Sequence, residues 1–121
     1  MSKKIAFMGT PVISGQILKS LYQNGFDIEV VYTQPPVESN RGHKLNKSPV
    51  HIMSEILNIP VRTPFKLDNS EENKFLQSKN ISLGIVVAYG QILKKDILDI
   101  PKYGWINICL LYTSPSPRDE Q

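Results

Sequence analysis

A turn made by Gly9, Thr10 and Pro11 follows the first apolar run of the sequence and could bind an anion. Pro11 fits the first position of a helix and Thr10 fits its cap, so free amide groups at the start of that helix would face the turn. A tight turn built around one glycine explains the pattern equally well. Neither a G-x-G-x-x-G sequence nor a Walker A sequence is present, which disfavours a dinucleotide and excludes a P-loop nucleotide site.

A basic loop between residues 34 and 48 carries Arg41, Lys44 and Lys47, which could contact the phosphates of an RNA. Prolines and a glycine break any helical pattern there, and loops longer than about 12 residues are functional more often than short ones. Solvated charge without a partner is the competing interpretation. No phenylalanine, tyrosine or tryptophan lies among these charges, so we do not expect the loop to stack on bases.

A third segment ends a strongly apolar run and could line a ligand pocket. Its apolar wall and exposed main-chain groups would suit a flat heteroaromatic ligand, although a buried strand and its turn need no ligand. The residues concerned are Ala88, Tyr89, Gly90, Gln91, Ile92 and Leu93. Asn107 lies in a later strand pattern, for which asparagine is poorly suited, and this misfit indicates either a site or a strand end. His43 and His51 fit exposed positions better than catalytic ones.

Alternating buried strands and helices must position these segments. Apolar and β-branched runs predict strands at 3–9, 28–33, 60–62, 82–88 and 104–108. Helical spacing and capping signals predict helices at 11–23 and 49–57, another from Ser70, and a helical turn at 94–98. This alternation predicts an α/β fold, an open and mostly parallel twisted sheet with helices on both faces. Ligands of such sheets bind beyond the carboxyl ends of the strands, where the segments above lie.

Composition places the chain among soluble globular domains. Of its 121 residues 40% are hydrophobic and 21% are charged, and a net charge of +3 requires no anionic partner. The apolar run at 5–8 is too short for a secretory signal or a membrane span, so we expect a cytoplasmic protein without a membrane partner. A single cysteine, Cys109, cannot form an internal disulfide, and no Cys or His pair has metal-ligand spacing. We expect a monomer without a metal.

Five motifs, in a common order and spacing, resemble the formyltransferase family, and within it the enzymes that act on methionyl-tRNA. None of them is specific alone, but together they are, and they span residues 3–108. In this sequence they read Phe7-Met8-Gly9-Thr10-Pro11, Val31-Tyr32-Thr33-Gln34-Pro35-Pro36, Arg41-Gly42 with Lys44-Leu45 and Ser48-Pro49-Val50, Val86-Val87-Ala88-Tyr89-Gly90-Gln91-Ile92-Leu93, and Ile100-Pro101-Lys102-Tyr103-Gly104 with Ile106-Asn107-Ile108. The resemblance implies a Rossmann-like formyltransferase fold, of which this chain holds the amino-terminal part.

The resemblance implies transfer of a formyl group from 10-formyltetrahydrofolate to the amino group of methionyl-tRNA in translation initiation. Residues 88–93 would line the pocket for the pterin ring of the folate, and the turn at residues 9–11 would border the substrate. Arg41 would contact the initiator methionyl-tRNA, with Lys44 and Lys47 as supporting phosphate contacts. The Asn107 amide would donate a hydrogen bond to the oxyanion that develops when the amine attacks the formyl carbon.

The chain departs from the family after Ile108. Where the family continues Asn-Ile-His and a Ser-Leu-Leu-Pro run, this sequence reads Asn107-Ile108-Cys109-Leu110-Leu111-Tyr112. Cys109 does not replace the histidine, because cysteine is a weak hydrogen-bond donor and cannot carry an imidazolium charge. The resemblance implies that the family's catalytic aspartate and its carboxy-terminal tRNA-binding domain would lie beyond the end of this sequence. We therefore expect an incomplete amino-terminal formyltransferase domain at 1–108, a non-native, disordered tail at 109–121, and no activity of the chain alone.

Two alternative functions stay open at this point. An amino-sugar or glycinamide ribonucleotide formyltransferase would share the sheet and the chemistry, although the turn at residues 9–11 and the Arg41 loop favour the tRNA enzyme. A non-catalytic fragment that keeps only a folate-binding or RNA-binding surface would fit the cysteine at position 109.

Overall fold

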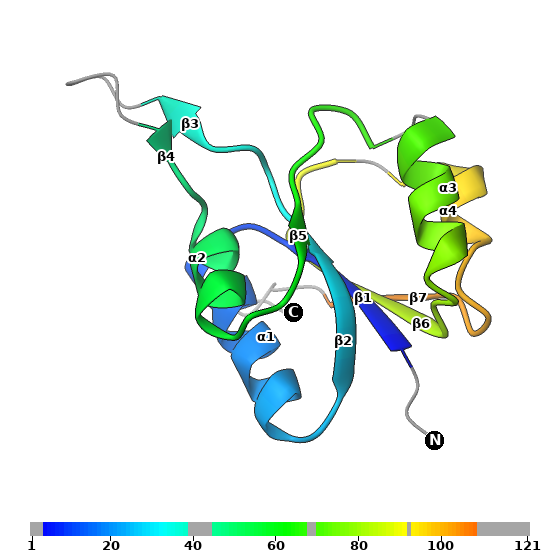
Figure 1. Ribbon diagram of the computed structural model, residues 1–121, viewed down its shortest axis with the longest axis horizontal. Helices are drawn as coiled ribbons and strands as arrows, with labels where there is room; N and C mark the ends of the chain where they lie inside the picture. Colours follow the sequence, from blue (N-terminus) through cyan, green and yellow to red (C-terminus); the bar gives the residue numbers. More distant parts are fainter. Residues whose placement is uncertain (1–3, 39–44, 68–69, 92, 109–121) are drawn as a thin grey trace, which may run out of the picture.

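A five-stranded sheet in the order β5-β2-β1-β6-β7 forms the centre of the computed structural model (Figure 1). The structure describes residues 4–38, 45–67, 70–91 and 93–108, with the backbone alone at Glu38 and Leu45. All neighbouring strands of this sheet are parallel, which confirms the predicted α/β class. The strands are β1 (Lys4–Gly9), β2 (Asp27–Tyr32), β5 (Val61–Arg62), β6 (Leu83–Val87) and β7 (Trp105–Asn107).

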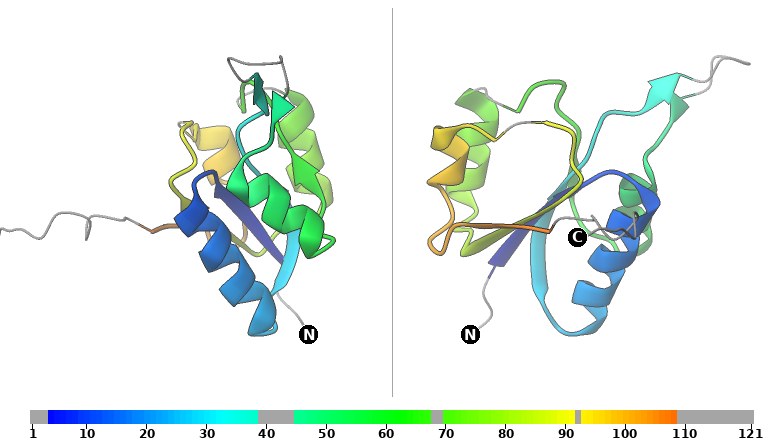
Figure 2. Two further views of the ribbon diagram at one scale, coloured as in Figure 1. Left: turned by 90° about the vertical axis from the view of Figure 1, so that its left-hand side faces the viewer. Right: turned by 180° about the vertical axis from the view of Figure 1, so that it is seen from behind.

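Helices cover both faces of the sheet, as predicted (Figures 1 and 2). They are α1 (Val12–Gln23), α2 (Pro49–Ile56), α3 (Ser70–Ser78) and α4 (Lys95–Leu98). Successive side chains of a strand point to opposite faces, so Ile5 and Phe7 of β1 pack on the side of α1 and α2. Ala6 and Met8 pack on the side of α3 and α4. All four are buried, which explains the unbroken apolar run in the sequence.

The two helix starts that the sequence predicted have different outcomes. At α2 the prediction is confirmed, because Pro49 takes the first position and Ser48 Oγ accepts a hydrogen bond from the His51 amide at 3.0 Å. At α1 it is wrong, because Pro11 is the cap and Thr10 makes no capping contact. The Thr10 hydroxyl instead donates to the carbonyl oxygen of Tyr89, 79 residues away, at 3.0 Å. A local capping pattern cannot reveal a partner so distant in sequence.

The predicted loop between residues 34 and 48 contains a small second sheet. Its strands β3 (Val37–Glu38) and β4 (Leu45–Asn46) are antiparallel, with Val37 opposite Asn46. This ladder extends away from the main sheet beside α2 (Figure 1). The sequence did not indicate it, because two residues in each strand are too few to show an alternating pattern.

Candidate functional site

Three predicted site segments meet along one edge of the sheet, at the carboxyl ends of β1, β6 and β7. Gly9 at the end of β1 pairs with Val87 at the end of β6. Asn107 at the end of β7 pairs with Val86. Strand order reverses between β1 and β6, because β2 and β5 lie on one side of β1 and β7 lies on the far side of β6. Open parallel sheets bind their ligands at such a reversal.

The turn that follows β6 has an unusual backbone. Ala88 has a φ of +56° and Gly90 a φ of +99°, so two of three successive residues are left-handed. For alanine this conformation costs roughly 1–2 kcal/mol, and strain of this kind persists where the surroundings impose it. A Cβ at Gly90 would lie 2.6 Å from Nε2 of Gln34. The positive φ at position 90 therefore favours glycine, and a Cβ there would displace the Gln34 carboxamide.

Two side chains fix the peptide that joins Tyr89 to Gly90. The Tyr89 carbonyl oxygen accepts hydrogen bonds from Thr10 Oγ1 and from Gln34 Nε2, each at 3.0 Å. These use both lone pairs of the oxygen. The peptide is trans, so the Gly90 N–H points away from that carbonyl, and within the described ranges it donates to no protein group. A rigidly held main-chain donor is thus available at the strand end.

The Gln91 side chain joins the turn by hydrogen bonds to the segment that follows β5. Its Oε1 accepts a hydrogen bond from the Leu67 amide at 2.8 Å, and its Nε2 donates to the Pro64 carbonyl at 3.2 Å. The same Nε2 lies 3.3 Å from the Tyr89 hydroxyl. The sequence predicted only main-chain and apolar contacts for this segment, so the positioning role of the Gln91 side chain is new.

A buried ion pair lies close to this turn, on the α3 side of the sheet. Glu72 is 5% exposed and accepts hydrogen bonds from Arg62 at 2.7 and 3.0 Å and from the Tyr32 hydroxyl at 2.8 Å. Burial alone would raise the pKa of Glu72, but Arg62 and Tyr32 outweigh it and hold the pKa below its ordinary value. Burial, with the Glu72 charge, raises the pKa of Tyr89, so its hydroxyl stays protonated. Glu72 lies in the first turn of α3, where an acidic residue also favours the start of a helix.

The end of β1 is closely packed against α1 and β6. A Cβ at Gly9 would lie 2.7 Å from the Ser14 Cβ and 2.8 Å from the Val87 carbonyl oxygen. The buried Ser14 hydroxyl donates to that carbonyl. Packing therefore accounts for Gly9 without a ligand. Pro11 is exposed, and Thr10 donates a hydrogen bond to the Tyr89 carbonyl.

The base of the basic loop is described, but its tip is not. Thr33 Oγ1 and Ser48 Oγ lie 2.6 Å apart and join the two ends of the loop. Lys47 is exposed, and its Nζ lies 2.6 Å from Oε2 of Glu55. The Lys47 ammonium lowers the pKa of the Glu55 carboxyl. Three predicted site residues lie outside the described ranges, namely Arg41, Lys44 and Ile92, and so do Cys109 and the rest of the predicted tail at 109–121.

His51 is less exposed than the sequence predicted. Its side chain is 15% exposed, and Nε2 lies 3.6 Å from Oε2 of Glu55. Its Nδ1 is buried without a hydrogen-bond partner in the described part of the chain. The prediction failed because the sequence of one short helix does not show which other elements pack against it.

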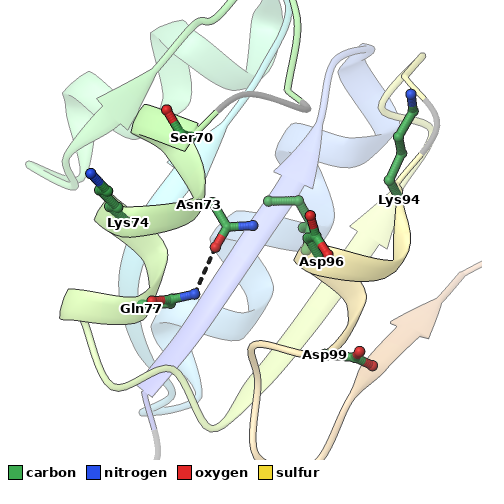
Figure 3. Close-up of a pocket in the computed structure, with 8 residues that line it drawn as sticks. Ser70, Asn73, Lys74, Gln77, Lys94, Asp96 and Asp99 are labelled. Carbon is green, nitrogen blue, oxygen red and sulfur yellow. Dashed lines mark hydrogen bonds between the residues drawn. The ribbon is translucent and has the colours of Figure 1, made fainter.

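A hollow of about 610 Å³ lies between α3 and α4 (Figure 3). Charges of both signs line it, and none of residues 88–91 contributes to it. Asn73 and Gln77 hydrogen-bond to each other at 2.7 Å on its α3 side (Figure 3). The lining residues are Ser70, Asn73, Lys74, Gln77, Lys94, Asp96, Ile97 and Asp99.

The groups at the sheet edge are neutral hydrogen-bonding groups. They are a main-chain amide at Gly90, a hydroxyl at Thr10 and carboxamides at Gln34 and Asn107.

Among the described residues, no three His, Cys, Asp or Glu side chains come together as metal ligands. None of the helices in the described ranges is long and apolar enough to cross a membrane.

The sequence matches the Formyl transferase family model over residues 3–110. The methionyl-tRNA formyltransferase of Pelagibacter ubique (strain HTCC1062) is 53% identical over 109 residues, which cover 89% of this chain and 35% of the relative. That of Clostridium perfringens (strain 13 / Type A) is 49% identical over 106 residues, which cover 87% of this chain and 34% of the relative. The chain thus spans about one third of the length of the curated relatives it matches.

Solved structures show the same fold. Glycinamide ribonucleotide transformylase 1 from Geobacillus kaustophilus superposes with a TM-score of 0.63 at 13% identity, over 96% of this chain and 63% of that one. Phosphoribosylglycinamide formyltransferase from Streptococcus pneumoniae TIGR4 superposes with a TM-score of 0.58 at 13% identity, over 88% of this chain and 56% of that one. At such identity the likeness concerns the fold alone, and it confirms the predicted Rossmann-like architecture. Because the family model matches nearly the whole described chain and the fold agrees, the chain belongs to the formyl transferase family, whose members are one-carbon transferases.

Proposed function

We propose that this chain carries the folate-binding part of an enzyme that formylates methionyl-tRNA. The formyl group would come from 10-formyltetrahydrofolate and would be transferred to the amino group of initiator methionyl-tRNA during translation initiation in the cytoplasm. One observation carries the proposal: at the reversal of strand order, Thr10 and Gln34 fix the Tyr89–Gly90 peptide, and no group in the described part of the chain accepts a hydrogen bond from its amide. Relatives up to 53% identical bear the name of that enzyme.

The turn after β6 binds the pterin ring in this proposal. A pterin carries donors and acceptors along its edge and apolar faces, so it suits main-chain groups beside an apolar wall. The Gly90 amide supplies a donor, and Ala88 is exposed at the same turn. Leu93, the last residue of the segment, is partly buried and packs against the core on the α3 side. Ile92 joins the group because it matches the family motif.

Asn107 would stabilise the transition state of formyl transfer. Attack of the amine on the formyl carbon puts negative charge on the formyl oxygen, and a preorganised amide donor stabilises that charge. Asn107 is exposed at the end of β7, next to the strand that carries the turn. The attacking nitrogen must also lose a proton. Because Cys109 stands where the family motif has histidine, we infer that this chain does not complete the reaction by itself.

Arg41, Lys44 and Lys47 are the proposed contacts to phosphates of the tRNA. Of the three, only Lys47 has a described position, and it is paired with Glu55. Exposed ion pairs are weak, so a phosphate could replace the Glu55 carboxylate at little cost. The base of the loop contacts the proposed folate turn through Gln34, and this contact supports the proposal that the two substrates would bind at one edge of the molecule.

A chimaera tests the proposed reaction. Residues 1–108 of this chain would replace the matching region of the Pelagibacter ubique relative, and formylation would be measured with 10-formyltetrahydrofolate and alternative acceptors. We expect formylation of charged initiator tRNA, but not of glycinamide ribonucleotide or an amino sugar. Asn107→Ala should lower kcat by roughly 10²–10³-fold. A chimaera that prefers another acceptor, or an Asn107→Ala chimaera with unchanged kcat, would contradict the proposal.

A further inference from the structure

Gln34 joins two segments that the proposed function assigns to different substrates. It is the first residue of the basic loop, and its Nε2 donates to the Tyr89 carbonyl, 55 residues away, at 3.0 Å. The contact is close packed as well as polar, because a Cβ at Gly90 would lie 2.6 Å from the same Nε2. A displacement of Gln34 must therefore change the surroundings of the Tyr89–Gly90 peptide.

The residues on either side of Gln34 are held in place. Thr33, immediately before it, is fully buried and lies 2.6 Å from the Ser48 hydroxyl at the other end of the loop. Ser48 is held in turn, because its oxygen caps α2. On the other side of Gln34, Pro35 and Pro36 have restricted backbone angles and lead directly into β3. Gln34 is therefore held on both sides, by the Thr33–Ser48 contact and by the two prolines that lead into β3.

We propose that Gln34 couples the basic loop to the folate-binding turn, so that RNA on the loop and folate at the turn change each other's affinity. The inference rests on the proposed function for the identity of the two ligands, but the coupling is a property of the fold. Folate binding selects the arrangement in which Thr10 and Gln34 both hold Tyr89 and aim the Gly90 amide. Removing one neutral hydrogen bond corresponds to roughly a five-fold change in affinity, and the effect of either ligand on the other is equal by linkage.

A double-mutant cycle on the 121-residue chain tests the coupling without any ligand. Thr33→Val removes the hydroxyl that joins the ends of the loop, and Gln34→Asn shortens the side chain so that its amide no longer reaches Tyr89. Gln16→Asn on the exposed face of α1 is the matched control. We expect Thr33→Val to shift the Gly90 amide resonance in the wild-type and control backgrounds and to leave it unshifted in the Gln34→Asn background. Equal shifts in all three backgrounds would overturn the inference.

Titrations with ligands separate this inference from the proposed function. Calorimetry with 5-formyltetrahydrofolate, a stable isomer of the donor, would be run with and without a short RNA helix. We expect RNA to change the folate affinity about five-fold in the chain and in Gln16→Asn, and not at all in Gln34→Asn. Gln34→Ala serves if Gln34→Asn does not fold. Should neither ligand bind, the proposed function is wrong for this chain, while the ligand-free cycle still decides the coupling.

Discussion

The side chains buried on the two faces of the sheet differ in kind. On the side of α1 and α2 the core consists of apolar side chains such as Phe7, Leu18 and Val50. On the side of α3 and α4, apolar residues surround Glu72, the one buried charged residue in the described ranges, with its partner Arg62. Buried charges are costly unless paired. Apolar packing thus stabilises both faces, but the face next to the Tyr89 turn depends also on an ion pair and therefore on pH.

Leu18→Ala should produce the largest loss of stability. Leu18 is fully buried on the apolar face, and truncation leaves a cavity. We expect the free energy of unfolding to fall by about 3 kcal/mol in urea titrations. Val12→Ala is the control on the same helix, because Val12 is 60% exposed, and its effect should stay within about 0.5 kcal/mol. A Leu18→Ala loss as small as that of the control would mean that this face does not form a packed core.

Glu72→Gln should be the next largest change, with a loss of about 2–3 kcal/mol at neutral pH. It leaves the Arg62 guanidinium, whose side chain is 28% exposed, without its carboxylate. Glu71→Gln is a matched control, since Glu71 is 81% exposed and 3.8 Å from the same guanidinium. We expect its effect to be below about 0.5 kcal/mol. If chemical denaturation gives the two variants equal stability, the buried pair does not stabilise this face.

The pH dependence of stability separates the two faces further. The pKa of Glu72 in the folded state lies below its ordinary value of 4.5, so its ion pair stabilises the fold above that pH. The contribution is lost as the pH falls through the lowered pKa. The difference between wild type and Glu72→Gln should therefore shrink in urea titrations taken from pH 7 to pH 3, while the Leu18→Ala difference stays constant. A Glu72→Gln difference that is constant with pH would place the stabilisation elsewhere.

Thr10→Val should have the smallest effect on stability and a clear effect on the site. It removes one of two hydrogen bonds to the Tyr89 carbonyl, at a cost of about 1 kcal/mol. We expect calorimetry to show folate affinity reduced about five-fold, because the Gly90 amide is aimed less firmly. Thr10→Ser keeps the hydroxyl and should bind as the wild type does. Equal affinity of the valine and serine variants would exclude a positioning role for Thr10.

Features that depend on residues close together in sequence were predicted, whereas contacts between residues far apart in sequence were not. Strands and helices were predicted well, because an apolar run such as that of β1 is local. Asn107 was placed at the correct edge, because every parallel strand ends there. The roles of Thr10, Gln34 and Gln91 were missed, since their partners lie 79, 55 and 24 residues away. The sequence did show that these polar residues follow the ends of strands, but it does not show which group each of them would hydrogen-bond to.

Nuclear magnetic resonance of the labelled chain with 5-formyltetrahydrofolate tests most directly whether the turn at 88–91 binds folate. We expect the largest changes at the amides of Gly90 and Gln91, with smaller ones at Asn107 on the neighbouring strand. Gly90→Ala, which would crowd Gln34, should abolish these changes. Largest changes at Lys74 and Lys94, which line the hollow between α3 and α4, would instead place the ligand there and contradict the assignment.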